Sequence, residues 1–210
     1  MLKAFAILVF VVFMQQVQSQ STSKIYLIRH AKVDIEKPGW GTSKSAADYK
    51  QEYNRFPVES FNPEKVLQII ENHETIDTVF CSPLNRAIQT ASLIFGEDAI
   101  LITDSILAEL DYPVVEFPIV QLPVKVWLFI SRVAWMTGIM GKEDDDYPHR
   151  KRELQIYSQK LVKNADRNEV TVVVAHGMVN RELIKILKAQ GWKPENNLSF
   201  TNLSVNCLEK

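Results

Sequence analysis

The chain has 210 residues, of which 46% are hydrophobic and 23% charged, and its formal net charge is −1. This composition is ordinary for one folded domain and excludes a disordered, fibrous or multi-span membrane protein. The balanced charge gives no overall attraction to nucleic acid or to anionic lipid. Binding of an anion would therefore depend on a local cluster of cations, and we expect no nucleic-acid partner.

The first residues have the pattern of an export signal. Lys3 precedes an apolar run over residues 4–14, and residues 17–19, Val-Gln-Ser, resemble a small-residue cleavage site. The run is too short to cross a bilayer, which takes roughly 20 apolar residues. We expect a signal peptide over residues 1–19 and a mature domain over residues 20–210. The mature protein is then exported, periplasmic or extracellular, with no stable membrane insertion after cleavage.

Export implies an oxidising compartment, in which Cys81 and Cys207 could form a disulfide. Two cysteines do not, however, make a disulfide framework. Each lies in an apolar stretch near the end of an expected strand, which favours two small buried residues over a bridge.

Apolar runs and segments of helical periodicity alternate through the rest of the chain. The apolar runs indicate strands buried on both faces, at residues 24–28, 77–81 and 169–175. The helical segments cover residues 63–73, 84–95, 148–164 and 179–190. A last run, residues 204–209, fits an edge strand. This order predicts an α/β fold with three layers, α/β/α, around a mostly parallel central sheet.

Two inserts interrupt this alternation and form an expected cap region. The first, about residues 33–61, is polar and long enough for a functional loop or a short helix. The second, about residues 112–147, begins with prolines and becomes strongly apolar over residues 124–140. Those residues fit a core or cap helix, or a lid whose apolar inner face selects substrates with a hydrophobic group.

Charged and polar side chains follow three of the expected strands. Arg29 and His30 come after the first, Arg86 lies in the first turn of the helix after the second, and His176 comes after the third. Open α/β sheets bind ligands at the carboxyl ends of their strands, so these four side chains are expected together. The helix N-terminus near Arg86 adds to a site that suits an anion.

These motifs resemble those of the histidine phosphatase, or phosphoglycerate mutase-like, superfamily, and they occur in that family's order over most of the mature chain. The resemblance implies that His30 is the nucleophile, that Arg29, Arg86 and His176 hold the phosphoryl oxygens, and that Glu109 is the general acid. His176 counts with His30 and Glu109 as catalytic, and neither a metal nor another cofactor is implied. The matching strings are Leu27-Ile28-Arg29-His30, Ser82-Pro-Leu-x-Arg86-Ala-x-Gln-Thr-Ala91, Leu107-x-Glu109 and Ala175-His176-Gly177.

The implied roles agree with the chemistry of phosphoryl transfer. A neutral imidazole that attacks phosphorus leaves charge on three equatorial oxygens, which fixed cations stabilise. Glu109 in a partly apolar site could stay protonated and donate to the leaving oxygen. Asp111, two residues further along, is the alternative for that role.

The residues after His30 depart from the commonest family pattern, because Ala31-Lys32 replaces Gly-Glu. Some phosphatases of the family also have alanine directly after the nucleophilic histidine. The loop that follows, residues 33–41, lacks the Asn-containing pattern of the mutases. This difference puts mutase activity in doubt. Lys32 could add a cation to the pocket, but we expect it to face solvent.

Other catalytic classes lack their motifs. A cysteine-based phosphatase needs a Cys-x5-Arg loop, whereas Cys81 and Arg86 are spaced Cys-x4-Arg with a proline between them. There is no Gly-x-Ser-x-Gly for a serine hydrolase, and the four histidines have no zinc-ligand spacing.

The sequence therefore predicts an exported phosphomonoesterase that acts through a phosphohistidine on His30. The alternatives are a phosphoglycerate mutase-like phosphotransferase and a noncatalytic phosphate-binding module. The substrate could be a small-molecule or a phosphoprotein phosphate ester, since the same anion pocket suits both. The oligomeric state stays open.

Overall fold

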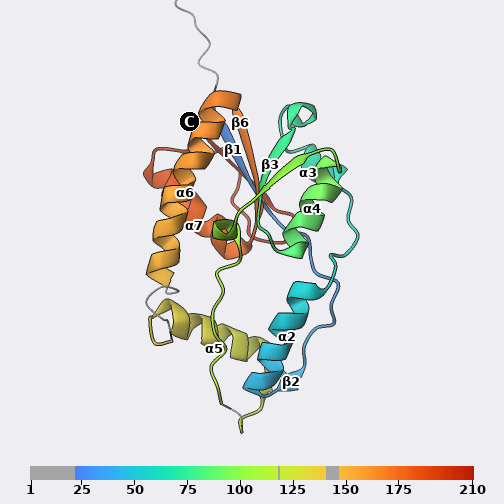
Figure 1. Cartoon of the computed structure of the whole chain (residues 1–210), viewed down its shortest axis with the longest axis vertical. Coiled ribbons are helices and arrows are strands. Elements are labelled where there is room, and N and C mark those ends of the chain that lie inside the picture. Colours follow the sequence, from blue (N-terminus) through green and yellow to red (C-terminus); the bar gives the residue numbers. More distant parts are fainter. Residues whose placement is uncertain (1–21, 118, 141–146) are drawn as a thin grey trace, which may run out of the picture.

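The computed structural model describes residues 22–117, 119–140 and 147–210. The expected signal peptide, residues 1–19, lies outside the described residues. The main sheet has the strand order β4-β3-β6-β1-β8-β7 (Figure 1). β4, β3, β6 and β1 are parallel, whereas β8 is antiparallel to both β1 and β7. In chain order the strands are β1 (Lys24–Arg29), β3 (Thr78–Cys81), β4 (Ile100–Thr103), β6 (Val170–Ala175), β7 (Lys193–Pro194) and β8 (Val205–Glu209).

Helices cover both faces of this sheet (Figure 1). Alternate residues of β1 belong to opposite faces, as the geometry of a strand requires. Ile25 and Leu27 belong to one core cluster, with leucines of α6 (Tyr147–Asn168) and α7 (Gly177–Ala189). Tyr26 and Ile28 belong to the other, with residues of α3 (Glu64–Leu67) and α4 (Asn85–Phe95). The three-layer α/β prediction with a mostly parallel sheet is therefore confirmed.

The helix predicted over residues 63–73 is too long. Asn62 does stabilise its start, because Oδ1 accepts a hydrogen bond from the backbone N–H of Glu64 at 3.0 Å. The α-helix ends at Leu67. Beyond it the backbone hydrogen bonds join residues three apart, as in the bond from the N–H of Ile70 to the Leu67 carbonyl at 2.9 Å. Asn72 then takes a left-handed conformation (φ 52°), which asparagine tolerates better than most residues. A 3-10 turn, η1 (His73–Thr75), follows.

The edges of the sheet also differ from the prediction. Residues 204–209 do form a strand, β8, but it lies between β1 and β7 and is not an edge. The edge on the other side is β4, which was not predicted, although its residues Ile-Leu-Ile-Thr form a short apolar and β-branched run. α6 runs to Asn168, beyond the expected end at residue 164, and stops where Glu169 adopts φ 63°.

The two inserts together form one cap beside the sheet (Figure 1). The first contributes β2 (Trp40–Gly41) and α2 (Ser43–Arg55), and the second contributes β5 (Leu122–Pro123) and α5 (Val124–Met136). β2 pairs with β5, and Nε1 of Trp127 donates to the Gly41 carbonyl at 3.0 Å. Trp127 also packs against Ala46 of α2. The inserts are therefore joined by both a small sheet and an apolar contact.

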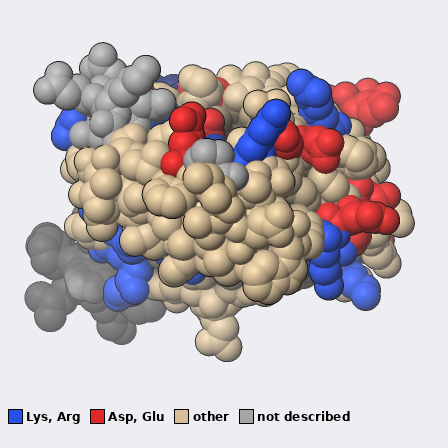
Figure 2. All heavy atoms as spheres, turned by 90° about the horizontal axis from the view of Figure 1, so that it is seen from below, with Lys and Arg blue, Asp and Glu red and all other residues tan. Residues whose placement is uncertain are grey.

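The apolar residues of α5 are divided between two faces. Trp127 and Trp135 are buried, whereas Phe129 is 67% exposed and Ile130 and Val133 are partly exposed. Figure 2, seen from the cap end, shows a broad surface with few charged side chains. Much of the apolar character of residues 124–140 is therefore turned outward and not toward a ligand. In the described part of the chain, no helix combines the length and apolarity needed to cross a membrane.

Candidate active site

Three neighbouring strands bring the predicted site residues to one edge of the sheet. The register aligns Arg29 of β1 with Ala175 of β6, and Cys81 of β3 with Val174 of β6. The residues that follow each strand therefore meet at the same level. They include His30, His176 and, through the start of α4, Arg86.

His30 is held in one tautomer. Its Nδ1 lies 2.7 Å from the Ala31 carbonyl, which can only accept, so Nδ1 carries the hydrogen. Nε2 then carries the ring's lone pair, which accepts a hydrogen bond from Nε of Arg86 at 3.2 Å. The backbone around the ring is fixed by the Ala31 N–H to Thr90 Oγ1 bond (2.9 Å). A buried, neutral imidazole with a defined lone pair is the form a nucleophile needs.

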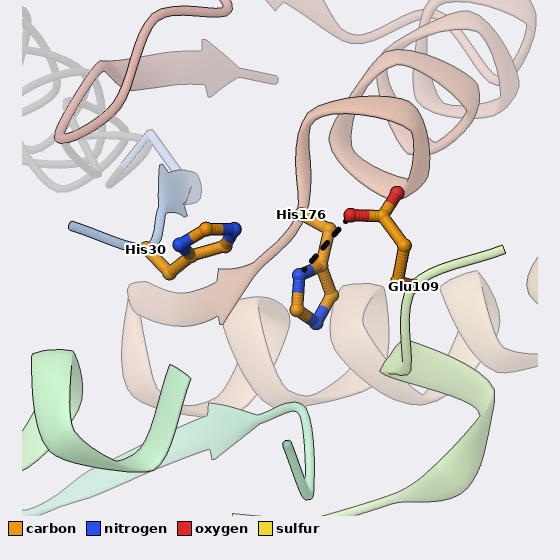
Figure 3. Close-up of side chains that lie close together, drawn as sticks. All are labelled: His30, Glu109 and His176. Carbon is orange, nitrogen blue, oxygen red and sulfur yellow. Dashed lines mark ion pairs between the residues drawn. The ribbon is translucent and has the colours of Figure 1, made fainter. Parts of the chain in front are cut away.

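His176 lies between Ser82 and Glu109. The Leu84 N–H donates to Oγ of Ser82 at 3.2 Å, and this Oγ lies 2.7 Å from Nε2 of His176. Nδ1 lies 3.4 Å from Oε2 of Glu109, the pair marked in Figure 3. The tautomer in which the Ser82 hydroxyl donates to Nε2 has its ring hydrogen on Nδ1, directed toward Glu109.

Arg86 lies in the first turn of α4 and is only 3% exposed. Its Nη1 donates to Oδ1 of Asn54 at 2.6 Å, and its guanidinium lies over the ring of Tyr53, 5.1 Å from the centroid. Its Nη2 lies 3.8 Å from Oε2 of Glu109. The cap therefore reaches the catalytic edge through two residues of α2.

The guanidinium of Arg29 uses only part of its hydrogen-bonding capacity within the described residues. Nη1 donates to the Phe200 carbonyl, but Nε is buried and has no hydrogen-bond partner among the described residues. A side chain at Gly177 would place its Cβ 3.4 Å from Cζ of Arg29. The backbone of Gly177 therefore lies directly beside the guanidinium, at a distance that a Cβ would fill with an ordinary van der Waals contact.

Burial and the two arginines set the protonation of the site. Burial, together with the charge of Arg86, lowers the pKa of His30 to about 3. The same two causes hold the pKa of His176 well below its usual value. Burial raises the pKa of Glu109, although Arg86 and other arginines oppose the rise. Both imidazoles are therefore neutral at ordinary pH, and Glu109 keeps its proton to higher pH than a solvated glutamate.

The remaining candidates make no contact with the two histidines, although Asp111 lines the same pocket as Glu109. Asp111 forms an ion pair with Lys50, and its side chain is 78% exposed. Lys32 forms an ion pair with Glu59 at the surface, as expected for a residue that faces solvent. Cys81 and Cys207 are both buried and free, so the disulfide alternative is wrong in this structure.

A pocket of about 390 Å³ opens beside the cluster. Arg29, Arg86 and Glu109 line its inner end. The cap supplies the other walls with aromatic and apolar side chains, namely Tyr49, Tyr53, Tyr112 and Leu128, and with the polar or charged side chains of Lys50, Asn54, Asp111 and Arg132. The sequence reasoning missed these cap residues, because no motif distinguishes them from the other polar and aromatic residues of the inserts.

The same side chains could in principle ligate a metal. One ligand atom each from His30, Glu109 and His176 lies within 4.8 Å of the others. Two imidazoles and a carboxylate are an ordinary zinc set. Nε2 of His30 already accepts from Arg86, however, and the guanidinium charges repel a cation and attract an anion. The electrostatics therefore favour a phosphate group.

A family comparison agrees with this chemistry. Residues 64–210 match the sequence model of the histidine phosphatase superfamily (branch 1). The match contains Arg86, Glu109 and His176 but begins after His30, which the fold brings beside them. No curated protein sequence matches the chain significantly.

Solved structures share the fold over nearly the whole chain. Phosphoserine phosphatase from Entamoeba histolytica, in complex with 3-phosphoglyceric acid, has a TM-score of 0.52 at 19% identity, covering 88% of this chain and 89% of that chain. Ecdysone phosphate phosphatase from Bombix mori, in complex with tungstate, has a TM-score of 0.50 at 11% identity, covering 88% of each. YhfR from Bacillus stearothermophilus has a TM-score of 0.50 at 17% identity, covering 88% and 89%. At these identities the likeness is one of fold.

Proposed function

Because the chain belongs to the histidine phosphatase superfamily (branch 1), we propose that it is a phosphomonoesterase that works through a phosphohistidine on His30. Family membership supports phosphatase activity in general. The observation that carries the finer proposal is the arrangement of His30, whose Nε2 lone pair lies 3.2 Å from Nε of Arg86. That pairing puts the nucleophile and a phosphate-binding cation in direct contact.

The first step is attack by Nε2 of His30 on phosphorus. A new N–P bond forms while the bond from phosphorus to the ester oxygen breaks. Arg29, Arg86 and the Nδ1–H of His176 supply donors for the three equatorial oxygens, whose charge grows in the transition state. Arg29 is suited to this because its Nε has no other partner in the described chain.

Glu109 acts as the general acid in this step. Burial raises its pKa and so favours the protonated carboxyl group, whose proton passes to the departing ester oxygen to give a neutral alcohol. The carboxylate that remains is stabilised by Arg86 and by His176, at 3.8 Å and 3.4 Å. Asp111, exposed and paired with Lys50, lacks these neighbours, which favours Glu109 for the role.

In the second step a water molecule attacks phosphorus and Glu109 takes its proton. The N–P bond breaks, inorganic phosphate is released and His30 returns to the neutral form. Burial favours this product because it holds the pKa of the ring at about 3.

The alcohol part of the substrate would lie in the pocket of about 390 Å³. Tyr49, Tyr53, Tyr112 and Leu128 offer apolar and aromatic surface beside the leaving oxygen. We propose that the apolar or aromatic part of the alcohol lies there. Replacement of Leu128 by Asn should weaken kcat/KM for an aryl phosphate more than for a small alkyl phosphate, and equal effects would argue against this pocket.

The test of the activity is hydrolysis of 4-nitrophenyl phosphate with a chelator present, comparing the wild type with His30→Ala and with His73→Ala. His73 is a partly buried histidine outside the site and serves as the control. We expect chelator-resistant turnover that is lost only in His30→Ala. Turnover that survives in His30→Ala would reject the mechanism, and phosphoryl transfer to an added alcohol in place of water would indicate a phosphotransferase.

We also propose that the protein is exported. The proposal depends on the charged, then apolar, residues at the start of the chain. The check is N-terminal sequencing of the protein recovered outside the cytoplasm, which should begin at Gln20. A Leu8→Arg change in the apolar run should retain the protein in the cytoplasm.

A further inference from the structure

A second pocket, of about 180 Å³, adjoins the active site and is lined by three arginines, Arg29, Arg132 and Arg181. Glu109 is the only acidic residue among its lining residues, and Met178 and Phe200 add apolar walls. We call it the arginine pocket. Its volume equals that of about six water molecules, enough for one compact anionic group.

These arginines have no strong anionic partner. In the described chain, none of the three forms an ion pair within 4.0 Å of a carboxylate. Arg132 has only a long bond from Nη2 to the hydroxyl of Tyr112 (3.4 Å) and lies over that ring. Arg181 lies over the ring of Phe200, 4.6 Å from the centroid.

Two of these guanidinium groups also have buried nitrogens without a partner. Nε of Arg29 and Nε of Arg132 are both buried and make no hydrogen bond among the described residues. A buried charged donor without an acceptor is costly, and most such groups in folded proteins are satisfied. In the proposed mechanism the scissile phosphoryl group supplies the acceptor for Arg29, so an oxyanion in the arginine pocket would supply the acceptor that Arg132 lacks.

The arginine pocket lies beside the bond that breaks. Arg29, Glu109 and Arg132 line both this pocket and the larger one of about 390 Å³. Glu109 is the residue that serves the leaving oxygen in the proposed mechanism. A group held in the arginine pocket must therefore belong to the alcohol, close to the ester oxygen.

We propose that the arginine pocket binds a second anionic group of the substrate, a carboxylate or a second phosphate carried by the alcohol within a few bonds of the scissile ester. This inference rests on the proposed phosphatase function. The preferred substrates are then phosphate esters with two anionic groups, in which one lies at His30 and the other near Arg132 and Arg181.

Arg181 gives the cleanest test of this subsite. Arg29 and Arg132 both affect the pKa of Glu109, so their removal would disturb the chemistry for every substrate. Arg181 lies on α7 at the exposed side of the pocket. Lys188, an exposed lysine two turns further along α7, provides the matched control for the loss of one positive charge.

The experiment compares propyl phosphate with 3-phosphonooxypropanoate and with propane-1,3-diyl bisphosphate, which differ only at the far end of the alcohol. We expect the wild type to prefer at least one of the two esters with a second anionic group over propyl phosphate by about tenfold in kcat/KM, as one charge-assisted contact allows. Arg181→Gln should reduce that preference about tenfold, and Lys188→Gln should leave it unchanged. The ester with the larger preference identifies carboxylate or phosphate as the second group. No preference in the wild type, or an equal loss in both variants, would overturn the inference.

Calorimetric binding of the same three esters to His30→Ala separates this inference from the proposed function. One result would retain the subsite and reject the phosphatase. It is that an ester with a second anionic group binds more tightly than propyl phosphate, that this difference is lost in Arg181→Gln, and that the wild type turns over none of the three. Equal binding of all three esters, with turnover in the wild type, would retain the phosphatase and reject the subsite.

Discussion

Nε of Arg86 donates to Nε2 of His30 across 3.2 Å. In the proposed mechanism, this hydrogen bond occupies the nitrogen that attacks phosphorus. An incoming phosphoryl group would compete for the guanidinium of Arg86, and its binding would free the lone pair of His30. On this proposal, the hydrogen bond from Arg86 keeps the imidazole of His30 oriented until a phosphate group takes its place as the partner of Arg86.

Replacement of Arg86 tests this coupling. Arg86→Gln removes contacts to His30, Asn54 and Glu109 at once, and we expect kcat/KM to fall by about 10²–10³. The pKa of His30 should rise, because the charge of Arg86 is one cause of its low value, but burial, the larger cause, will keep it below its usual value. NMR titration of the histidine ring measures the pKa. Arg55→Gln, at the exposed end of α2, is the control, and an unchanged pKa in Arg86→Gln would contradict the account.

The role of Glu109 should be visible in the dependence on the leaving group. Glu109→Gln cannot donate a proton, so kcat for a poor leaving group such as propanol should fall by about 10²–10⁴. The fall should be much smaller for 4-nitrophenol, which leaves as an anion without help. Asp111→Asn should show no such dependence, since its side chain is exposed and paired with Lys50. The opposite pattern in the two variants would transfer the acid role to Asp111.

Ser82 is expected to act on the reaction through His176. Its Oγ accepts from Leu84 and lies 2.7 Å from Nε2 of the histidine, and we propose that its hydroxyl donates to this nitrogen and so keeps the ring hydrogen on Nδ1. Ser82→Ala should allow both neutral tautomers, visible in the ¹⁵N shifts of the ring, and lower kcat about tenfold for the loss of one oriented donor. Ser158→Ala, which removes another buried hydroxyl, should change neither. A single unchanged tautomer in Ser82→Ala would rule out this positioning role.

Acid should destabilise the protein through His30. The pKa of His30 is lowered to about 3, whereas a histidine in the unfolded chain titrates near pH 6.5. Between these values the unfolded state binds a proton that the folded state does not, so the free energy of unfolding falls as pH falls. One such group contributes about 1.4 kcal/mol per pH unit. Urea unfolding between pH 6 and pH 4.5 should show a shallower slope for His30→Gln than for the wild type or His73→Gln, and equal slopes would contradict the prediction.

The catalytic edge could be predicted from the sequence because it depends on local signals. Arg29, His30 and His176 directly follow buried strands, and Arg86 opens a helix, so a parallel sheet must bring them together. Glu109 follows no such strand end, and its position came from the family resemblance.

The cap contribution could not be predicted in the same way. Tyr53 and Asn54 reach Arg86 only because α2 packs against α5 and beside the sheet. Packing between segments this far apart in the chain leaves no motif or regular spacing from which it could be predicted. The place of Arg132 beside Glu109 depends on the same packing. The short α3 reflects turn geometry around Asn72, a local preference that the helical pattern concealed.

The central claim is that His30 carries the phosphoryl group. The most direct test is to mix the enzyme with a ³²P-labelled ester and to stop the reaction rapidly without acid. The account predicts a labelled enzyme that is stable in alkali and lost in acid, with the label mapped to His30 by mass spectrometry and absent from His30→Ala. Turnover of the ester without any labelled histidine, or with the label on another residue, would contradict it.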